Sequence, residues 1–253
     1  MVDATARRGA EALDDYLFDT RGYVKRPRCL GEDEVAALHR HLAPHWCETT
    51  SPGVRRIRDL RTASPELADL AERLPRALGI YRFINQPFRL IEAYALHRIA
   101  GSEQDLHNGH SQPQASPWGT ASRTMWRHHT YHDGRTYCMM VKVLVYLSDV
   151  RSPEDGPFCL VEGSHKANHA FPLRPEELDA AIAAGSFPGL STVCVETGDV
   201  LILNEALMHG TLCKTSNQPR VVLAFSYAPR FVSDYAEVRD GSTAAICETD
   251  FYP

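Results

Sequence analysis

The sequence lacks any apolar run of the roughly 20 residues that a transmembrane helix needs. It also lacks a charge excess: 27 Lys and Arg stand against 32 Asp and Glu, for a formal net charge of −5. Nothing in this balance favours nucleic acid or an anionic membrane as a partner. The opening stretch MVDATARRGAEALDDY contains no apolar core of the kind that a secretory signal has. We therefore expect a cytoplasmic protein that binds neither nucleic acid nor membrane.

Cysteine pairs are missing as well. The seven cysteines are scattered and odd in number, and none stands in a C-x-x-C pair, so we expect reduced, mostly buried thiols. Histidine, by contrast, is plentiful. Six of the twelve histidines fall at positions 97, 107, 110, 128, 129 and 132. Such clustering indicates a metal site, although scattered surface histidines are the commoner case.

The pattern of apolar residues predicts helices first and strands afterwards. A helix is expected at 31–42, and another begins with Ser64 as N-cap and ends near Gly79. Strands are expected at 88–98, 137–150, 157–163, 191–203 and 219–231, with one helix at 174–185 between them. No repeat or linker divides the chain. The sequence therefore predicts one domain over 1–253, mainly β with flanking helices, built as an antiparallel barrel or jelly roll.

Two of the expected strands place charged residues on a mostly apolar face. Lys142 alternates with the valines of 141–145 and shares its face with Leu144 and Tyr146. Arg220 shares a face with small residues, among them Ala224. Such faces suit a barrel lumen that holds a ligand. The alternative is that Lys142 and Arg220 reach solvent at strand ends.

Residues 110–137 form a polar, aromatic connection without periodicity. A connection of this length inside a compact domain is typical of a lid, a binding loop or a disordered segment. Its aromatic and basic content favours a substrate lid. The same content indicates that the substrate under this lid is a polar or anionic small molecule. Candidate substrate contacts within it are Trp118, Arg123, Trp126, Arg127, His129 and His132.

Four motifs follow one another in a characteristic order: LHNG (106–109), GPFCLVEGSHKAN (156–168), GDVLILNEALMHG (198–210) and QPRVVLAFSY (218–227). The order resembles that of the phytanoyl-CoA dioxygenase family of non-heme iron, 2-oxoglutarate-dependent oxygenases, over most of the chain. The resemblance implies a double-stranded β-helix, a jelly roll of the cupin kind, which agrees with the strand pattern. It also implies Fe(II), 2-oxoglutarate and O2 as cofactors.

The resemblance assigns roles to particular residues. His107 and His209 would bind the metal, and Arg220 would bind the distal carboxylate of 2-oxoglutarate through its fixed bidentate fork. His165 in the GSHK motif is expected to be structural. Further candidates for cofactor binding are Thr211, Ser226, Lys142 and Tyr94.

The proximal metal motif of this family is H-x-D or H-x-E, yet none of the twelve histidines has an acid two places on. The carboxylate position after His107 is Gly109. One interpretation is a radical halogenase, in which Gly109 leaves a coordination position open for chloride. A second is a hydroxylase or other oxidase whose third ligand is water, Asn108, His110, Glu162, His129 or His132. A third is a binding module that has lost catalysis. The substrate could be free or tethered to a carrier protein.

Overall fold

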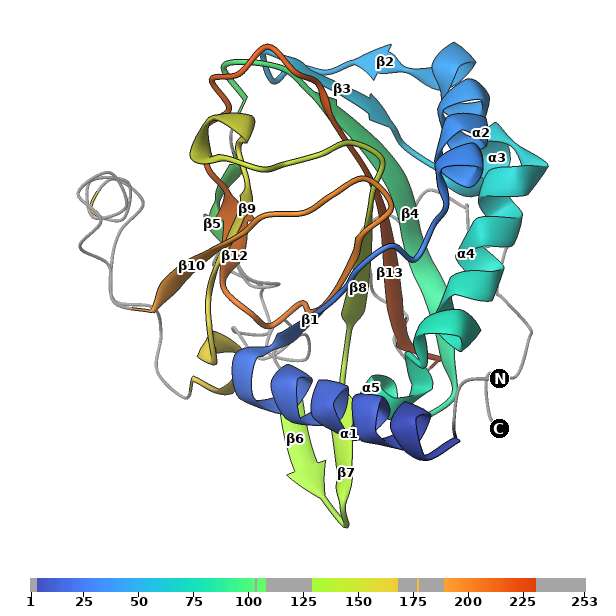
Figure 1. Ribbon diagram of the computed structural model, residues 1–253, viewed down its shortest axis with the longest axis vertical. Helices are drawn as coiled ribbons and strands as arrows, with labels where there is room; N and C mark the ends of the chain where they lie inside the picture. The colour runs from blue at the N-terminus through green and yellow to red at the C-terminus, as the bar shows by residue number, and fades with distance from the viewer. Residues whose placement is uncertain (1–3, 103, 108–128, 168–176, 178–188, 231–253) are drawn as a thin grey trace, which may run out of the picture.

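The computed structural model describes residues 4–102, 104–107, 129–167, 177 and 189–230. Its core is two antiparallel sheets that face each other as a jelly roll (Figure 1). The larger sheet has the order β1-β11-β8-β13-β4-β3-β2 and the smaller the order β10-β9-β12-β5. The predicted fold class is thereby confirmed.

The strands of the larger sheet are β1 (Tyr23–Arg26), β2 (Cys47–Glu48), β3 (Val54–Ile57), β4 (Phe88–Arg98), β8 (Val141–Tyr146), β11 (Val200–Asn204) and β13 (Arg220–Pro229). Those of the smaller sheet are β5 (Gln104–His107), β9 (Phe158–Val161), β10 (Leu190–Val193) and β12 (His209–Thr211). A separate hairpin consists of β6 (His129–His132) and β7 (Arg135–Cys138).

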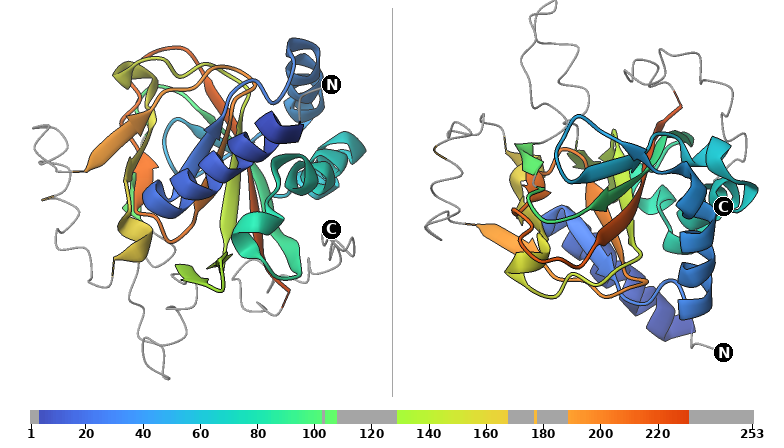
Figure 2. Two further views of the ribbon diagram at one scale, coloured as in Figure 1. Left: turned by 60° about the horizontal axis from the view of Figure 1, so that its bottom comes forward. Right: turned by 90° about the horizontal axis from the view of Figure 1, so that it is seen from above.

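The helices are α1 (Ala4–Arg21), α2 (Glu32–Leu42), α3 (Leu60–Ala63), α4 (Pro65–Leu78) and α5 (Tyr81–Ile84). Figures 1 and 2 show α2, α3 and α4 beside β4 and β13, on the side away from the smaller sheet. The helix α4 begins where predicted, because the Ser64 hydroxyl accepts a hydrogen bond from the Leu67 amide at 3.3 Å. It ends where predicted, because Gly79 adopts the left-handed conformation.

The alternating faces of β8 separate two apolar clusters, as the sequence predicts. Val141, Val143 and Val145 pack with the helices on the outer face of the larger sheet. Leu144 and Tyr146 pack between the two sheets. Burial of each such side chain stabilises the fold by about 1.5–3 kcal/mol. The lumen therefore lies on the face that carries Lys142.

Several expectations about the elements need correction. The stretch 191–203 forms two strands, β10 and β11, because Gly198 turns the chain between them with a φ of +87°. A Cβ at Gly198 would lie 2.4 Å from the Leu30 carbonyl oxygen. The stretch 137–150 is likewise divided, between β7 and β8. The helix predicted at 174–185 lies outside the described residues except for residue 177.

The described cysteines are free thiols, as expected, but they are not mostly buried. Cys138 and Cys159 are buried, whereas the other four are exposed: Cys29, Cys47, Cys194 and Cys213. The expectation was wrong because these four lie at strand edges and in loops rather than on inward faces. Within the described ranges, no helix is long and apolar enough to cross a membrane.

Candidate active site

The two predicted metal ligands lie side by side in the smaller sheet. His107 ends β5, His209 begins β12, and the two are direct partners in the antiparallel pairing. Their ring centroids are 4.5 Å apart. His209 Nδ1 lies 2.7 Å from the Leu207 carbonyl oxygen. A carbonyl can only accept, so Nδ1 donates and Nε2 presents a lone pair, which is the form that binds a metal.

The surroundings of His209 favour its neutral state. Burial first, and then the charges of His107 and Lys142, hold the pKa of His209 well below its ordinary value. A metal binds the neutral imidazole, so no proton has to be displaced from His209 at pH 7.

A third protein ligand is not evident in the described part of the chain, where no group of three or more His, Cys, Asp or Glu side chains could hold a metal ion. Glu162 instead accepts a hydrogen bond from the Tyr23 hydroxyl at 3.3 Å and pairs with Arg21. Gly109, Asn108 and His110 lie outside the described residues. The same is true of the lid candidates Trp118, Arg123, Trp126 and Arg127.

The two described lid histidines have other partners. His129 Nε2 lies 3.0 Å from Asp19 Oδ1, and His129 Nδ1 lies 2.9 Å from Asn204 Nδ2. His132 is 60% exposed, with its ring stacked 4.3 Å from that of Tyr137. His129 of the hairpin thus contacts both α1 and β11, whereas His132 faces solvent.

His165 is structural, as expected. It is buried, and its Nε2 donates to the Asp19 carbonyl oxygen at 3.0 Å, which ties the 3-10 turn Ser164–Lys166 to α1. Its ring meets that of His129 edge to face at 4.6 Å. Burial, and then the charge of His129, lower the pKa of His165 to about 4.

Arg220 lies at the start of β13 and is buried, with 4% of its surface exposed. Its guanidinium donates to the Gly156 carbonyl oxygen, and its Nε has no hydrogen-bond partner in the described structure. Lys142 is buried as well, at 7%. The alternative that Arg220 and Lys142 reach solvent at strand ends is therefore wrong.

Thr211 supplies a second unpaired polar atom near Arg220. Thr211 and His209 lie two residues apart on β12 and so share a face. The Thr211 hydroxyl is buried without a hydrogen-bond partner in the part of the chain described. Cys159 pairs with Gly210 between them, and burial raises the pKa of Cys159 to about 12 while the Arg220 charge opposes that rise. The unpaired Thr211 and Arg220 donors fit a carboxylate beside the histidine pair, as 2-oxoglutarate requires.

The sequence analysis missed a second buried arginine here. Arg98 is the direct partner of Arg220 across β4 and β13, and 6% of it is exposed. Burial, and then the Arg220 charge, lower the pKa of Arg98 to about 10. The sequence alternation could have identified Arg98. The strand 88–98 was predicted with its correct bounds, and Arg98 lies four residues from Tyr94 and so on the same face. Two adjacent cations in a lumen favour an anionic ligand.

Lys142 is engaged by a carboxylate that the sequence analysis also missed. Its Nζ lies 3.0 Å from Glu205 Oε1, and both side chains are buried. The Tyr94 ring lies beneath Lys142, with 5.9 Å from Nζ to the ring centroid. Burial raises the pKa of Tyr94, and Lys142 opposes that rise. The structure thus brings two of the candidate cofactor-binding residues, Lys142 and Tyr94, together with an acid.

Ser226 does not join Arg220. It lies six residues further along β13, roughly 20 Å at the ordinary rise of a strand. Its hydroxyl lies 3.0 Å from Glu92 Oε2, and Glu92 Oε1 lies 3.5 Å from Arg56 Nη2. Arg56 also lies over the Tyr94 ring at 4.4 Å. Ser226 therefore belongs to a second polar group that includes Glu92 and Arg56, which the sequence analysis did not assign.

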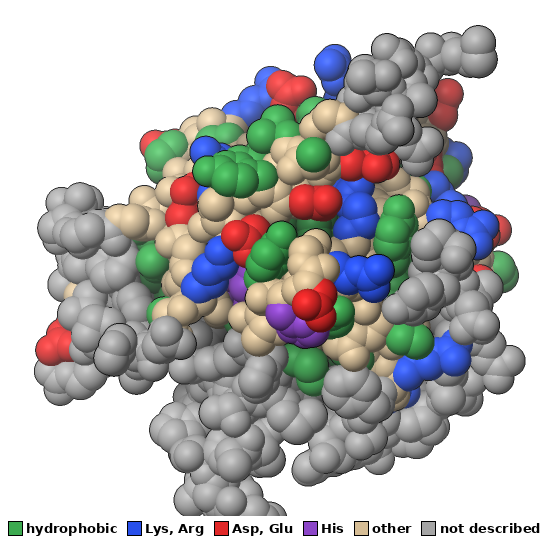
Figure 3. Space-filling view, turned by 90° about the horizontal axis from the view of Figure 1, so that it is seen from below, with side chains coloured by type: hydrophobic (Ala, Val, Ile, Leu, Met, Phe, Trp, Pro, Cys, Tyr) green, Lys and Arg blue, Asp and Glu red, His purple; other side chains and the backbone are tan. Residues whose placement is uncertain are grey.

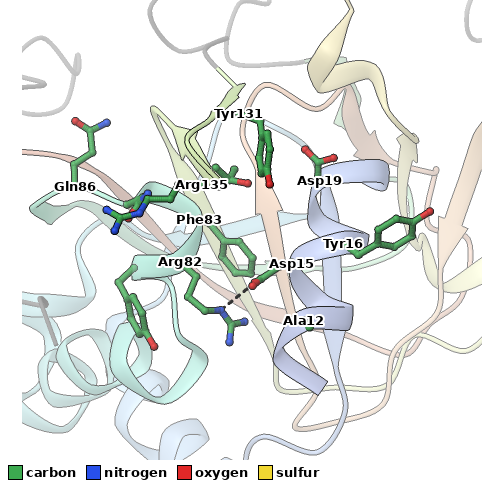
Figure 4. Close-up of a pocket in the computed structure, with 13 residues that line it drawn as sticks. Ala12, Asp15, Tyr16, Asp19, Arg82, Phe83, Gln86, Tyr131 and Arg135 are labelled. Atoms are coloured by element: carbon green, nitrogen blue, oxygen red, sulfur yellow. Dashed lines mark ion pairs between the residues drawn. The ribbon is translucent and has the colours of Figure 1, made fainter. Parts of the chain in front are cut away.

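A separate cavity of about 640 Å³ lies outside the jelly roll, between α1, α5 and the β6–β7 hairpin. Figure 4 shows Asp15 on α1 pointing to Arg82 on α5, with a closest ion-pair distance of 3.0 Å, and Tyr131 of the hairpin across the opening. The hairpin part of the predicted lid thus lines a cavity, and none of the predicted site residues that the structure describes lies in its lining. The described part of the lower face mixes acidic, basic and apolar side chains (Figure 3).

Comparisons with known proteins found one family model and several solved structures that match this chain. The model of the family described as phytanoyl-CoA dioxygenase matches residues 18–222. HygX from Streptomyces hygroscopicus, solved with nickel, 2-oxoglutarate and hygromycin B, is 41% identical, with 90% of this chain and 93% of HygX covered and a TM-score of 0.76. HygX with iron bound is 40% identical over 90% and 92%, with a TM-score of 0.71.

A more distant structure shares the fold alone. The epimerase SnoN, solved with Fe3+, alpha ketoglutarate and nogalamycin RO, is 20% identical over 88% of this chain and 84% of SnoN, with a TM-score of 0.63. A search of curated protein sequences found no match.

Proposed function

This chain belongs to the phytanoyl-CoA dioxygenase family, and from that premise we propose that it oxidises an aliphatic C–H bond of a polar small molecule. It is a non-heme iron enzyme of the 2-oxoglutarate-dependent kind. The observation that carries the proposal is the pairing of His107 with His209, together with buried Thr211 on the same strand β12 and buried Arg220 at the start of β13.

Each residue has a definite task in this proposal. His107 and His209 hold iron, and Arg220 with Thr211 holds the distal carboxylate of 2-oxoglutarate. Bound iron and 2-oxoglutarate supply the oxidising power that removes hydrogen from an unactivated carbon. The charged lumen side chains Arg220, Lys142 and Glu205 are buried, and burial strengthens the charge interactions that they make.

The similarity to HygX supports a polar substrate. HygX was solved with hygromycin B, a glycoside with many hydroxyl and amino groups. The lumen of this chain carries polar groups of matching character, including buried Glu205 and partly buried Tyr94. We propose a substrate of this polar class rather than a plain acyl chain.

Succinate formation tests the proposed oxidation. The protein would be loaded with Fe(II) and supplied with 2-oxoglutarate, dioxygen and a panel of aminoglycosides that includes hygromycin B. We expect succinate release to rise with at least one member of the panel, and His209→Ala to abolish the rise. Binding of a panel member without any rise in succinate would favour the non-catalytic binding module instead.

The role of Gly109 distinguishes two possible reactions, chlorination and hydroxylation of the substrate. We propose that Gly109, which has no side chain to offer a metal, would leave room for chloride on iron held by His107 and His209, and that the enzyme would then chlorinate its substrate. The lack of a third His, Cys, Asp or Glu ligand within the described ranges supports an open position. The alternative is a hydroxylase that uses water or a side chain from 108–128 as third ligand.

Product mass separates these outcomes. Turnover in chloride buffer should give a product about 34 Da heavier than the substrate, because chlorine from the open coordination position replaces hydrogen. Gly109→Asp should abolish that product, because a carboxylate would fill the open position. A gain of one oxygen in chloride-rich buffer, with no chlorinated product, would establish hydroxylation.

A further inference from the structure

Glu205 is a buried carboxylate whose two oxygens have different surroundings. It lies in the turn directly after β11, and 4% of it is exposed. Its Oε1 accepts a hydrogen bond from Lys142 Nζ at 3.0 Å. Its Oε2 is buried and has no hydrogen-bond partner in the described structure. Buried carboxylate oxygens without a partner are costly, so this one calls for an explanation.

The turn holds Glu205 firmly. The Glu205 amide donates to the Met140 carbonyl oxygen at 3.1 Å. The Ala206 amide donates to the Asn204 side-chain oxygen at 2.9 Å, and the Leu207 amide donates to the Asn204 carbonyl oxygen at 2.9 Å. The carboxylate is therefore placed by the backbone before any ligand arrives, as a recognition group must be.

The same turn leads to the metal site. Its Leu207 carbonyl oxygen accepts the hydrogen bond from His209 Nδ1 at 2.7 Å. The Lys142 charge that neutralises Glu205 also acts on His209. A group that met Glu205 Oε2 would therefore lie in the lumen near the iron ligand.

A second lumen carboxylate gives the contrast. Glu92 has both oxygens engaged, one by the Ser226 hydroxyl and the other by Arg56. A purely structural ion pair is expected to resemble Glu92. Glu205 differs because one oxygen is held by Lys142 and the other is left open.

We propose that Glu205 Oε2 accepts a hydrogen bond from a substrate hydroxyl, and that the substrate is a polyhydroxylated molecule. This inference rests on the proposed function. Lys142 balances the charge of Glu205 and Arg56 that of Glu92, so a neutral donor fits the lumen better than a further cation. A hydroxyl satisfies the open oxygen without adding charge.

The substitution Glu205→Gln gives the sharpest test. Lys142 can only donate, so the oxygen of the new side-chain amide must turn toward Lys142 Nζ. The amide NH2 then occupies the place of Oε2 and cannot accept, so the substrate hydroxyl loses its charged acceptor and can only turn to accept a weaker, neutral hydrogen bond. Shape and volume stay nearly the same, whereas the acceptor at that position becomes a donor and the negative charge that Lys142 balances is lost.

The experiment measures the dissociation constant of hygromycin B by calorimetry. Wild type, Glu205→Gln and the control Glu162→Gln are each loaded with nickel and 2-oxoglutarate, so that no turnover occurs. Glu162 pairs with Tyr23 and Arg21. We expect Glu205→Gln to weaken hygromycin B binding at least tenfold, and Glu162→Gln to change it less than twofold. The affinity for 2-oxoglutarate should stay within twofold in both variants.

Each other outcome overturns the inference. Equal affinity of Glu205→Gln and wild type, with a lower melting temperature only, would make the Lys142–Glu205 pair structural. No binding of hygromycin B to wild type would reject this substrate class. Loss of the Glu205→Gln effect with N-acetylated hygromycin B would identify an ammonium donor instead of a hydroxyl. If wild type failed to bind 2-oxoglutarate, the proposed function itself would fall.

Discussion

Replacing Arg220 with methionine should weaken 2-oxoglutarate binding far more than it weakens the fold. Methionine keeps an unbranched apolar stem but removes the guanidinium. Arg220 is 4% exposed, and its neighbour Arg98 has a pKa that the Arg220 charge helps to lower. Loss of that charge therefore relieves a repulsion within the protein and at the same time removes the partner of the bound carboxylate.

The expected magnitude follows from this setting. Breaking a buried ion pair by removal of one partner costs about 3–5 kcal/mol. Arg98 remains beside the site and compensates in part, so we take the lower end, about 3 kcal/mol. At about 1.4 kcal/mol per tenfold change, this corresponds to roughly 150-fold weaker binding. Arg220→Lys keeps the charge but loses the bidentate fork, and should cost roughly tenfold.

Calorimetric titration of 2-oxoglutarate into the nickel-loaded protein measures this effect without turnover. Arg151→Ala is a suitable control, because Arg151 is 67% exposed and pairs with Asp149 at the surface. Its 2-oxoglutarate affinity should equal that of wild type. If Arg220→Met stayed folded and bound 2-oxoglutarate within twofold of wild type, Arg220 would not be the carboxylate partner.

Two further predictions concern stability. The pKa of His165 is about 4 in the fold and 6.5 in its ordinary state, so the unfolded chain binds more protons between these values and stability falls as the pH falls through that window. From pH 7.5 to 5 the free energy of unfolding falls by about 2 kcal/mol for this reason. In urea unfolding measured at several pH values, His165→Gln should remove this fall. The same fall in wild type and His165→Gln would show that His165 does not titrate in this way. Gly198→Ala should lower the free energy of unfolding by at least about 2 kcal/mol, because φ is +87° and the Leu30 carbonyl oxygen is in the way. Gly9→Ala should instead raise it by about 0.5–1 kcal/mol, because Gly9 lies within α1 with open space around it; equal effects of the two substitutions would refute the backbone argument.

Sequence patterns over a few residues correctly predicted two elements. The alternation of apolar and polar residues predicted the bounds of β4, Phe88–Arg98, and the capping residues Ser64 and Gly79 predicted both ends of α4. The resemblance that the ordered motifs carry implied that His107 and His209 share one site, and the structure makes them direct partners between β5 and β12.

Contacts between segments that are distant in the sequence could not be predicted from local patterns. Lys142 and Glu205 are 63 residues apart and meet only because β8 and β11 are neighbours. Ser226 shares a face with Arg220, as predicted, but a strand of ten residues places them at opposite ends of the lumen. The shared face was predictable from alternation, whereas position along the lumen needs the register of the neighbouring strands.

The most direct test of the iron and 2-oxoglutarate site is an anaerobic titration of the protein with Fe(II) and 2-oxoglutarate. The chelate of iron and 2-oxoglutarate held by His107 and His209 should produce a weak visible charge-transfer band that saturates at one iron per chain. His209→Ala should abolish the band, because one of the two paired ligands is gone. A wild-type protein that shows no band, or a band that His209→Ala leaves unchanged, would contradict the assignment.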